Sequence, residues 1–133
     1  MNKAIVGIGS NTVDAKARVE ECCRQLSYVA TESRFSSIYE TEAVGTIPQP
    51  NYHNCVGVLR TSQPFEELKQ KFKDMEREVG RLPEHKAEGK VIIDIDIVVW
   101  NGEVIKPTDL TRTYMTIGME ELGITAEQFY NYL

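Results

Sequence analysis

Two aspartates, Asp94 and Asp96, stand two residues apart in the apolar, β-branched segment 91–100. Side chains of a strand point alternately to its two faces, so both carboxylates share one face, with Cα atoms roughly 6.5–7 Å apart. The opposite face carries five aliphatic side chains and is expected to be buried: Val91, Ile93, Ile95, Ile97 and Val99. Neighbouring carboxylates repel each other and attract a cation, and magnesium in proteins takes one or two carboxylates together with phosphate oxygens. The pair therefore indicates a divalent-metal site, with an equal alternative in which both carboxylates are solvated or paired with Lys and Arg on a sheet face.

Two further groups of residues have the chemistry of ligand contacts. Tyr52 and Asn54 share one face of the predicted strand 52–61, where an amide can read the edge of a heterocycle and a phenol ring can pack on it. The polar loop 81–90 carries three cationic side chains, those of Arg81, Lys86 and Lys90. Such a loop can bind phosphate, although each group taken alone is more often structural or solvated.

The segment Gly7-Ile8-Gly9-Ser10-Asn11 lies between a predicted strand and a predicted helix. It lacks the third glycine of a dinucleotide fingerprint and the Gly-Lys-Ser/Thr sequence of a P-loop. The segment from Gly9 onward therefore predicts a tight turn that leads into a helix cap.

The elements that position these residues follow a recognisable order. Strands are predicted at 3–8, 34–39, 52–61 and 91–100, and amphipathic helices at 13–28 and 65–79. This strand–helix–strand–strand–helix–strand order predicts a ferredoxin-like α+β fold, an antiparallel sheet with two helices packed on one face. The other face, or its rim, is left for ligands. Asn101-Gly102 predicts a hairpin returning through 103–105, and short helices are expected at 119–122 and 126–132.

The composition predicts one globular domain spanning residues 1–133. Its net charge of -5 argues against a general nucleic-acid binder, and its apolar runs are too short to span a bilayer. Three cysteines without C-x-x-C spacing, Cys22, Cys23 and Cys55, are expected to be unpaired thiols in a reducing compartment. We expect a cytoplasmic monomer without nucleic-acid or membrane partners.

Six short motifs occur in register along the chain: Gly9-Ser10-Asn11, Tyr39-Glu40-Thr41, Pro50-Asn51-Tyr52-His53-Asn54, Glu76-x-x-x-Gly80-Arg81, Ile93-Asp94-Ile95-Asp96-Ile97 and Asn101-Gly102-Glu103-Val104-Ile105. In this order, from Lys3 to about Thr111, they resemble the 6-hydroxymethyl-7,8-dihydropterin pyrophosphokinase family of folate biosynthesis. The resemblance implies a ferredoxin-like fold. It also implies Mg²⁺-dependent transfer of pyrophosphate from ATP to the reduced pterin, giving AMP.

The resemblance also implies roles for single residues. Asp94 and Asp96 would bind two magnesium ions between ATP and the attacking hydroxyl, and Arg81 would complete the catalytic set. Pterin-binding positions would be Thr41, Val44, Tyr52 and Asn54. Nucleotide-binding positions would be Glu76, Lys90, Ile97 and Tyr114.

The chain departs from the family's pattern at groups that hold phosphate and pterin. Val91 stands where the family has a phosphate-binding arginine, with Lys90 beside it, and Glu88 stands where an aromatic residue covers the pterin. No histidine follows His85, so Tyr114 is only a partial match to a downstream Pro-His motif, and the chain ends early for the family. Two alternatives follow: a homologue that binds nucleotide or pterin without efficient turnover, and a metal-free interaction module.

Overall fold

The computed structural model describes residues 1–45, 48–80, 82 and 84–132. Its strands are β1 (Asn2–Ser10), β2 (Glu32–Phe35), β3 (Tyr39–Thr41), β4 (Tyr52–Thr61), β5 (Asp94–Trp100) and β6 (Glu103–Val104). Its helices are α1 (Ala15–Val29), α2 (Phe65–Glu78), α3 (Glu84–Ala87), α4 (Pro107–Leu110), α5 (Thr113–Glu121) and the 3₁₀ helix η1 (Ala126–Tyr132). Within this described part, no helix has the length and apolar character needed to cross a membrane.

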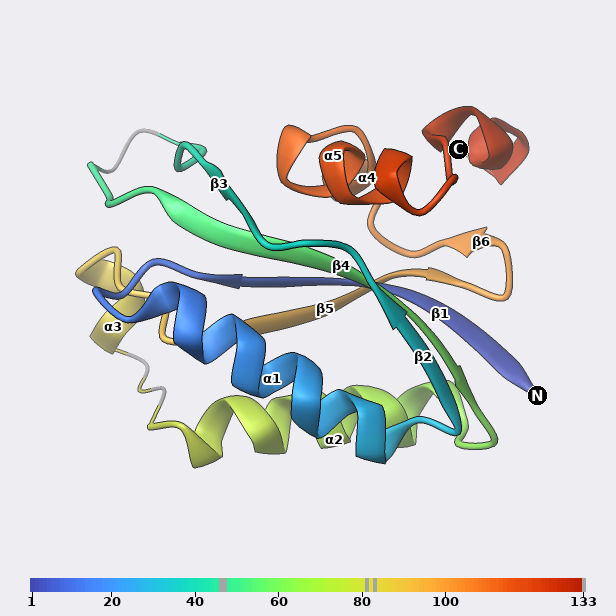
Figure 1. Cartoon of the computed structure of the whole chain (residues 1–133), viewed down its shortest axis with the longest axis horizontal. Coiled ribbons are helices and arrows are strands. Elements are labelled where there is room, and N and C mark those ends of the chain that lie inside the picture. The colour runs from blue at the N-terminus through green and yellow to red at the C-terminus, as the bar shows by residue number, and fades with distance from the viewer. Residues whose placement is uncertain (46–47, 81, 83, 133) are drawn as a thin grey trace.

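The six strands form one open antiparallel sheet in the order β2-β4-β1-β5-β6, with β3 pairing the remaining length of β4. Helices α1 and α2 lie against one face of the sheet, while α4 and α5 lie against the other (Figure 1). The predicted ferredoxin-like α+β architecture is therefore confirmed.

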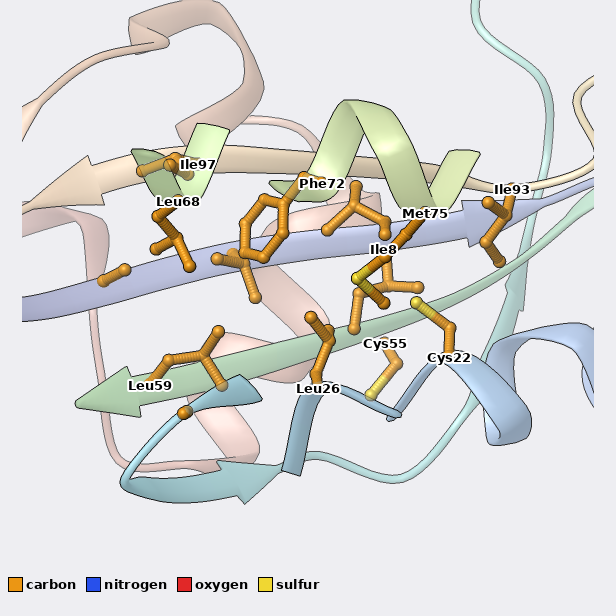
Figure 2. Close-up of a cluster of buried hydrophobic side chains, with 14 of the residues drawn as sticks. Ile8, Cys22, Leu26, Cys55, Leu59, Leu68, Phe72, Met75, Ile93 and Ile97 are labelled. Atoms are coloured by element: carbon orange, nitrogen blue, oxygen red, sulfur yellow. The ribbon is translucent and has the colours of Figure 1, made fainter. Parts of the chain in front are cut away.

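The main hydrophobic core lies between the sheet and helices α1 and α2, and Figure 2 shows its side chains meeting from all these elements. Val19, Cys22 and Leu26 recur at helical spacing on α1, so one stripe of that helix is buried. Leu68 and Phe72 do the same on α2. The described cysteines are free thiols, with Cys22 and Cys55 buried, as the sequence predicts.

A second hydrophobic cluster covers part of the opposite sheet face, which the sequence analysis left open. Buried Met115 and Met119 of α5 and Leu110 of α4 pack there against Val56 of β4. This correction arises because the C-terminal segment folds back across the sheet. The ligand face is consequently reduced to the part of the sheet that α4 and α5 leave uncovered.

The strand predicted at 34–39 is two strands, β2 and β3, which pair with different parts of β4. Ser36 lies between them, and its hydroxyl accepts a 2.9 Å hydrogen bond from the Val56 amide. The Ser36 amide still donates to the Val56 carbonyl at 2.8 Å, but its hydroxyl takes the place of its own carbonyl as the acceptor, which interrupts the regular ladder.

Strand β5 departs from simple alternation near its end. Ile5 pairs with Val99 and Val6 pairs with Ile97, so Val98 is an extra residue in the ladder, a β-bulge. The bulge moves Val99 into the second cluster rather than the main core. Trp100 moves to the helix side, where its ring meets Phe65 edge to face at 5.4 Å.

Candidate active site

A cavity of about 210 Å³ lies over the middle of the sheet, between β1, β4 and β5 and the helices α4 and α5. Its floor is Gly7 and Gly9 of β1; the strand runs on to Ser10, so Gly9 lies inside it and not in the predicted turn. A Cβ atom at Gly9 would lie 2.9 Å from Asn54 Nδ2, and one at Gly7 would lie 2.7 Å from Met115 Sδ. A side chain at Gly9 would therefore displace the Asn54 amide, and one at Gly7 would displace the end of Met115. Two glycines at strand spacing are the signal for this flat surface that sequence reasoning missed.

The two predicted metal-binding aspartates form one wall of this cavity. Asp96 pairs with Gly7 and Asp94 pairs with Gly9 in the β1–β5 ladder, which places both carboxylates beside the floor. Burial and the nearby Asp94 carboxylate raise the pKa of Asp96 to about 6, and Lys106 opposes this shift. The site thus holds two carboxylates whose mutual repulsion a cation would relieve.

Lys106 is a site residue that the sequence analysis did not identify. Its Nζ lies 2.6 Å from Asp96 Oδ1, and the two side chains are 45% and 30% exposed. It reaches this position because the Asn101-Gly102 turn, with positive φ at both residues, brings the chain back along β5. The hairpin signal was available in the sequence, but the path that brings the Lys106 side chain to Asp96 was not.

The opposite wall of the cavity comes from β4 and β3. Tyr52 and Asn54 lie on one face of β4, and Asn54 is buried. The Thr41 hydroxyl donates a 2.5 Å hydrogen bond to Asn54 Oδ1, while Asn54 Nδ2 lies over Gly9. This bond orients the amide at the cavity floor, and Val44, 50% exposed, lines the same space.

The remaining wall comes from α4 and α5. Tyr114 donates its hydroxyl hydrogen bond to Asp109, and both residues line the cavity with Met115. Burial, followed by this contact, raises the pKa of Tyr114 above its ordinary value, so the phenol stays protonated at neutral pH. The Tyr39 hydroxyl donates a 2.7 Å hydrogen bond to the Tyr114 carbonyl, which ties the start of α5 to β3.

A second, more open cavity of about 760 Å³ adjoins the first at Tyr52, which lines both. Three cationic side chains surround it, those of Lys73, Arg77 and Lys90. Lys73 and Arg77 were missed, although their spacing of four residues on α2 places them on one helix face with Glu76. A cationic cavity next to paired carboxylates suits a metal-bound polyphosphate.

Glu76 lines this second cavity but is only 5% exposed. Its Oε2 accepts a 2.8 Å hydrogen bond from the backbone amide of Ile95, the residue between the two aspartates. The carboxylate of α2 therefore anchors the stretch of β5 that carries the candidate metal ligands.

Asn11 anchors the loop that leads into β5. Its Nδ2 donates a 2.7 Å hydrogen bond to the Gly89 carbonyl, and its Oδ1 accepts one of 2.7 Å from the Val91 amide. Its own amide donates to the Val91 carbonyl at 3.0 Å. These bonds hold Lys90 and Val91 along the edge of the second cavity.

Seven predicted site residues meet in the first cavity: Thr41, Val44, Tyr52, Asn54, Asp94, Asp96 and Tyr114. Glu76 and Lys90 meet in the second, which Tyr52 also lines. Ile97 lies in the main core, 4% exposed, and lines neither of these two cavities. Arg81 lies outside the residues that the structure describes.

The donor atoms present fit magnesium better than a metal that prefers a protein cage. In the described ranges, no group of three or more histidine, cysteine, aspartate or glutamate side chains is arranged to hold a metal ion. Asp94 and Asp96 supply hard carboxylate oxygens from one wall, and the Lys106 ammonium occupies a cation position on Asp96. Magnesium commonly takes such a pair and completes its coordination with water and phosphate.

Comparison with known proteins agrees with this geometry. A family model described as 7,8-dihydro-6-hydroxymethylpterin-pyrophosphokinase (HPPK) matches residues 5–124. Three similar proteins are each named 2-amino-4-hydroxy-6-hydroxymethyldihydropteridine pyrophosphokinase. The protein of Aquifex aeolicus is 35% identical over 106 residues, covering 80% of this chain and 66% of that protein. The protein of Bacillus subtilis is 34% identical over 112 residues, covering 82% of this chain and 66% of that protein. The protein of Haemophilus influenzae is 26% identical over 126 residues, covering 93% of this chain and 78% of that protein.

The chain spans about two thirds of the length of the Aquifex and Bacillus relatives. The family match itself covers nearly all of the chain, including the three walls and the floor of the first cavity. On this match, the chain belongs to the HPPK family.

Proposed function

We propose that this chain transfers the pyrophosphoryl group of ATP to 6-hydroxymethyl-7,8-dihydropterin and releases AMP, a step of folate biosynthesis. The observation that carries the proposal is a pair of cavities that share Tyr52 as a lining residue, one with a glycine floor and the other lined by cationic side chains. A flat heterocycle and a polyanion need these opposite surroundings. Membership of the HPPK family supports the same reaction.

The first cavity is the proposed pterin site. Its volume of about 210 Å³ suits a small flat molecule, because drug-sized pockets typically measure about 300–1,000 Å³. The Asn54 amide, oriented by Thr41, would read the edge of the heterocycle, and the Tyr52 ring would pack on it. Val44 would cover its exposed side.

The second cavity is the proposed nucleotide site, with Glu76 and Lys90 among its contacts. Asp94 and Asp96 would hold magnesium, two ions when ATP is present. Bound magnesium would supply charge neutralisation on the phosphates and orientation of the attacking hydroxyl. Tyr114 and Arg81 stay predicted nucleotide and catalytic contacts, and Ile97 would act through packing beneath the site.

In the transfer, the hydroxymethyl oxygen of the pterin bonds to the β-phosphorus of ATP. The bond from that phosphorus to the α,β-bridging oxygen breaks, its electron pair stays on AMP, and the hydroxyl proton leaves to water. Little covalent help is needed, so the contribution of the chain is alignment and charge. The walls that carry Asn54 and Asp96 face the same cavity, which supports bringing both substrates to one point.

The proposal includes a monomeric state, one domain over residues 1–133 and a cytoplasmic location. Free thiols at Cys22, Cys23 and Cys55 suit a reducing compartment. Size-exclusion chromatography with light scattering tests the monomeric state, and a mass near twice 15.1 kDa would contradict it.

The experiment that tests the proposed reaction is AMP release from ATP in the presence of the reduced pterin and Mg²⁺. Asp94→Ala and Asp96→Ala should each reduce the rate by at least about a hundredfold, because each removes a carboxylate that is asked to hold charge in the transition state. Asp14→Ala, which removes an exposed carboxylate near the start of α1, should leave the rate unchanged.

Binding must be measured beside turnover. Calorimetry with a non-hydrolysable ATP analogue, with and without pterin, should show both ligands bound together. Binding of both ligands without AMP at any substrate concentration would overturn the transfer reaction and leave a binding protein.

A further inference from the structure

We propose that Lys106 is an internal counter-ion that occupies the cation position on Asp96 and competes there with a divalent metal ion. When metal and nucleotide bind, the ammonium is displaced from Asp96 and turns to the nucleotide phosphates. This inference rests on the proposed function for its second half only, since the competition is a property of the nucleotide-free protein.

The first support is the geometry of the contact. Lys106 Nζ lies 2.6 Å from Asp96 Oδ1, a distance at which an ammonium and a metal ion cannot both occupy the same side of one oxygen. The Lys106 side chain is 45% exposed, so it has room to leave this position without disrupting the core. Asp96 is anchored in β5 and stays in place.

The second support is the balance of charge around the ammonium. Three carboxylates act on it: Asp96, then Asp109, then Asp94. All three line the first cavity, where the phosphate that is transferred must approach the pterin, and without a cation they repel that phosphate. One lysine partly neutralises this wall, and a metal ion that replaces it frees one positive charge beside the incoming phosphates.

The third support is the way the backbone delivers Lys106. The amides of Ile105 and Lys106 both donate to the Val98 carbonyl, at 2.8 and 3.2 Å, so the chain bends at the end of β6. Pro107 then begins α4 and stops further pairing along β5. The short α4 and the bulged β5 therefore hold the start of the lysine side chain close to Asp96.

The test is Mn²⁺ binding to the nucleotide-free protein, followed by calorimetry or electron paramagnetic resonance. Lys106→Gln should bind Mn²⁺ about tenfold more tightly than the wild type, equivalent to about 1.4 kcal/mol, because the competing charge is gone. Lys106→Arg, which keeps the charge, should stay within about threefold of the wild type. Lys69→Gln, an exposed lysine on α2, controls for the change in net charge.

A double variant separates direct competition at Asp96 from long-range repulsion between the Lys106 charge and Mn²⁺. In the Asp96→Asn background, Lys106→Gln should no longer change Mn²⁺ affinity, because the contact that couples the two residues is already absent. Equal gains in both backgrounds, or unchanged Mn²⁺ affinity in Lys106→Gln alone, would overturn the competition.

The proposed contact between displaced Lys106 and the nucleotide phosphates is tested with a non-hydrolysable ATP analogue in saturating Mg²⁺. Lys106→Gln should weaken analogue binding by about tenfold, since the released ammonium no longer meets phosphate. Unchanged analogue affinity overturns this half only. If no AMP is formed by the wild type but the Mn²⁺ result holds, the proposed reaction fails and the competition stands.

Discussion

The carboxylate of Asp96 carries opposing influences at the scale of one side chain. Burial and Asp94 favour its protonated form, whereas Lys106, 2.6 Å away, favours the ionised form. The first two dominate, so the pKa of Asp96 rises to about 6. In the folded protein the ionised form of this carboxylate is destabilised, and a bound cation would stabilise it.

Stability should depend on pH through this carboxylate. The pKa of Asp96 is higher in the folded than in the unfolded chain, so its ionisation destabilises the fold. This loss of stability is absent below about pH 4, grows between about pH 4 and 6, and is complete above about pH 6. Without metal, Asp96→Asn should therefore stabilise the protein at pH 7.5 by about 1–2 kcal/mol and give no gain at pH 4. Thermal melting in EDTA at pH 7.5 and at pH 4 measures this difference in stability, and an equal stabilisation at the two pH values would contradict the prediction.

The glycine floor makes a second prediction at the residue scale. In Gly9→Ala, the new Cβ meets Asn54 Nδ2 at 2.9 Å, so the amide must move although Thr41 holds its oxygen. We expect the affinity for the reduced pterin to fall by at least about tenfold, as a lost hydrogen-bonding edge implies. Fluorescence titration with pterin measures it, with Lys3→Ala on an exposed part of β1 as the control; undiminished affinity would remove Gly9 from the pterin site.

At the scale of elements, a buried carboxylate links α2 to β5. Glu76 accepts the Ile95 amide at 2.8 Å, and the preceding and following residues of β5 are the two aspartates. The helix thereby sets the position of the strand that carries the candidate metal site. Glu76 is predicted to contact nucleotide and lines the second cavity; its hydrogen bond to the Ile95 amide is a structural contact beside that role.

The hydrogen bond between Glu76 and the Ile95 amide should survive the loss of the Glu76 charge better than the loss of its oxygen. Glu76→Ala leaves the Ile95 amide buried without this partner and should lower the free energy of unfolding by about 2–3 kcal/mol. Glu76→Gln retains a carbonyl oxygen and should lose no more than about 1 kcal/mol. Urea unfolding compares them, with the exposed Glu78→Ala on the same helix as the control. Equal losses in the two Glu76 variants would show that the hydrogen bond is not what matters.

At the scale of the whole molecule, helices cover both faces of the sheet (Figure 1). The first cavity lies on the face that carries α4 and α5, where those helices leave part of the sheet uncovered. α5 closes the cavity with Tyr114 and Met115 and also forms part of the second hydrophobic cluster. Tyr39 and Glu121 tie the helix to the strands below, through the Tyr114 carbonyl and the Ser37 amide. The cavity is therefore complete only when the C-terminal segment is packed on the sheet.

The close seating of α5 can be tested at Gly118. A Cβ there would lie 2.6 Å from Val56 Cγ2 and 2.7 Å from the Tyr39 hydroxyl, so the helix would have to lift from the sheet. Gly118→Ala should cost about 1–3 kcal/mol of stability, the usual penalty for overpacking. Ile117→Ala, at a side chain 45% exposed on the same helix, should cost less. Chemical denaturation measures both, and a neutral Gly118→Ala would contradict the close packing.

Local patterns in the sequence were sufficient for the elements that form the main core. The spacing of apolar residues predicted α1, α2 and β4 nearly at their observed limits, because burial of one face leaves a periodic trace in the chain. The same reasoning placed Asp94 and Asp96 on one face of a strand, and both line the cavity. Family motifs added Thr41 and Tyr114 to that cavity, which spacing alone did not identify.

Contacts between distant segments left no such trace. The hydroxyl of Ser36 divides one predicted strand into two, and the bulge at Val98 reverses the faces of Val99 and Trp100. Alternation is a rule within one strand, whereas a bulge depends on the register of its neighbour.

Asp94 and Asp96 are thus known from the sequence as a pair on one face, since strand geometry requires it. Only the tertiary structure brings Lys106 to Asp96, lays Gly7 and Gly9 as a bare floor beside both, and closes the space with α5. The physical reason is that a side chain's neighbours along the chain follow from local geometry. Its neighbours across the sheet follow from which surfaces pack together, and that is decided by the whole fold.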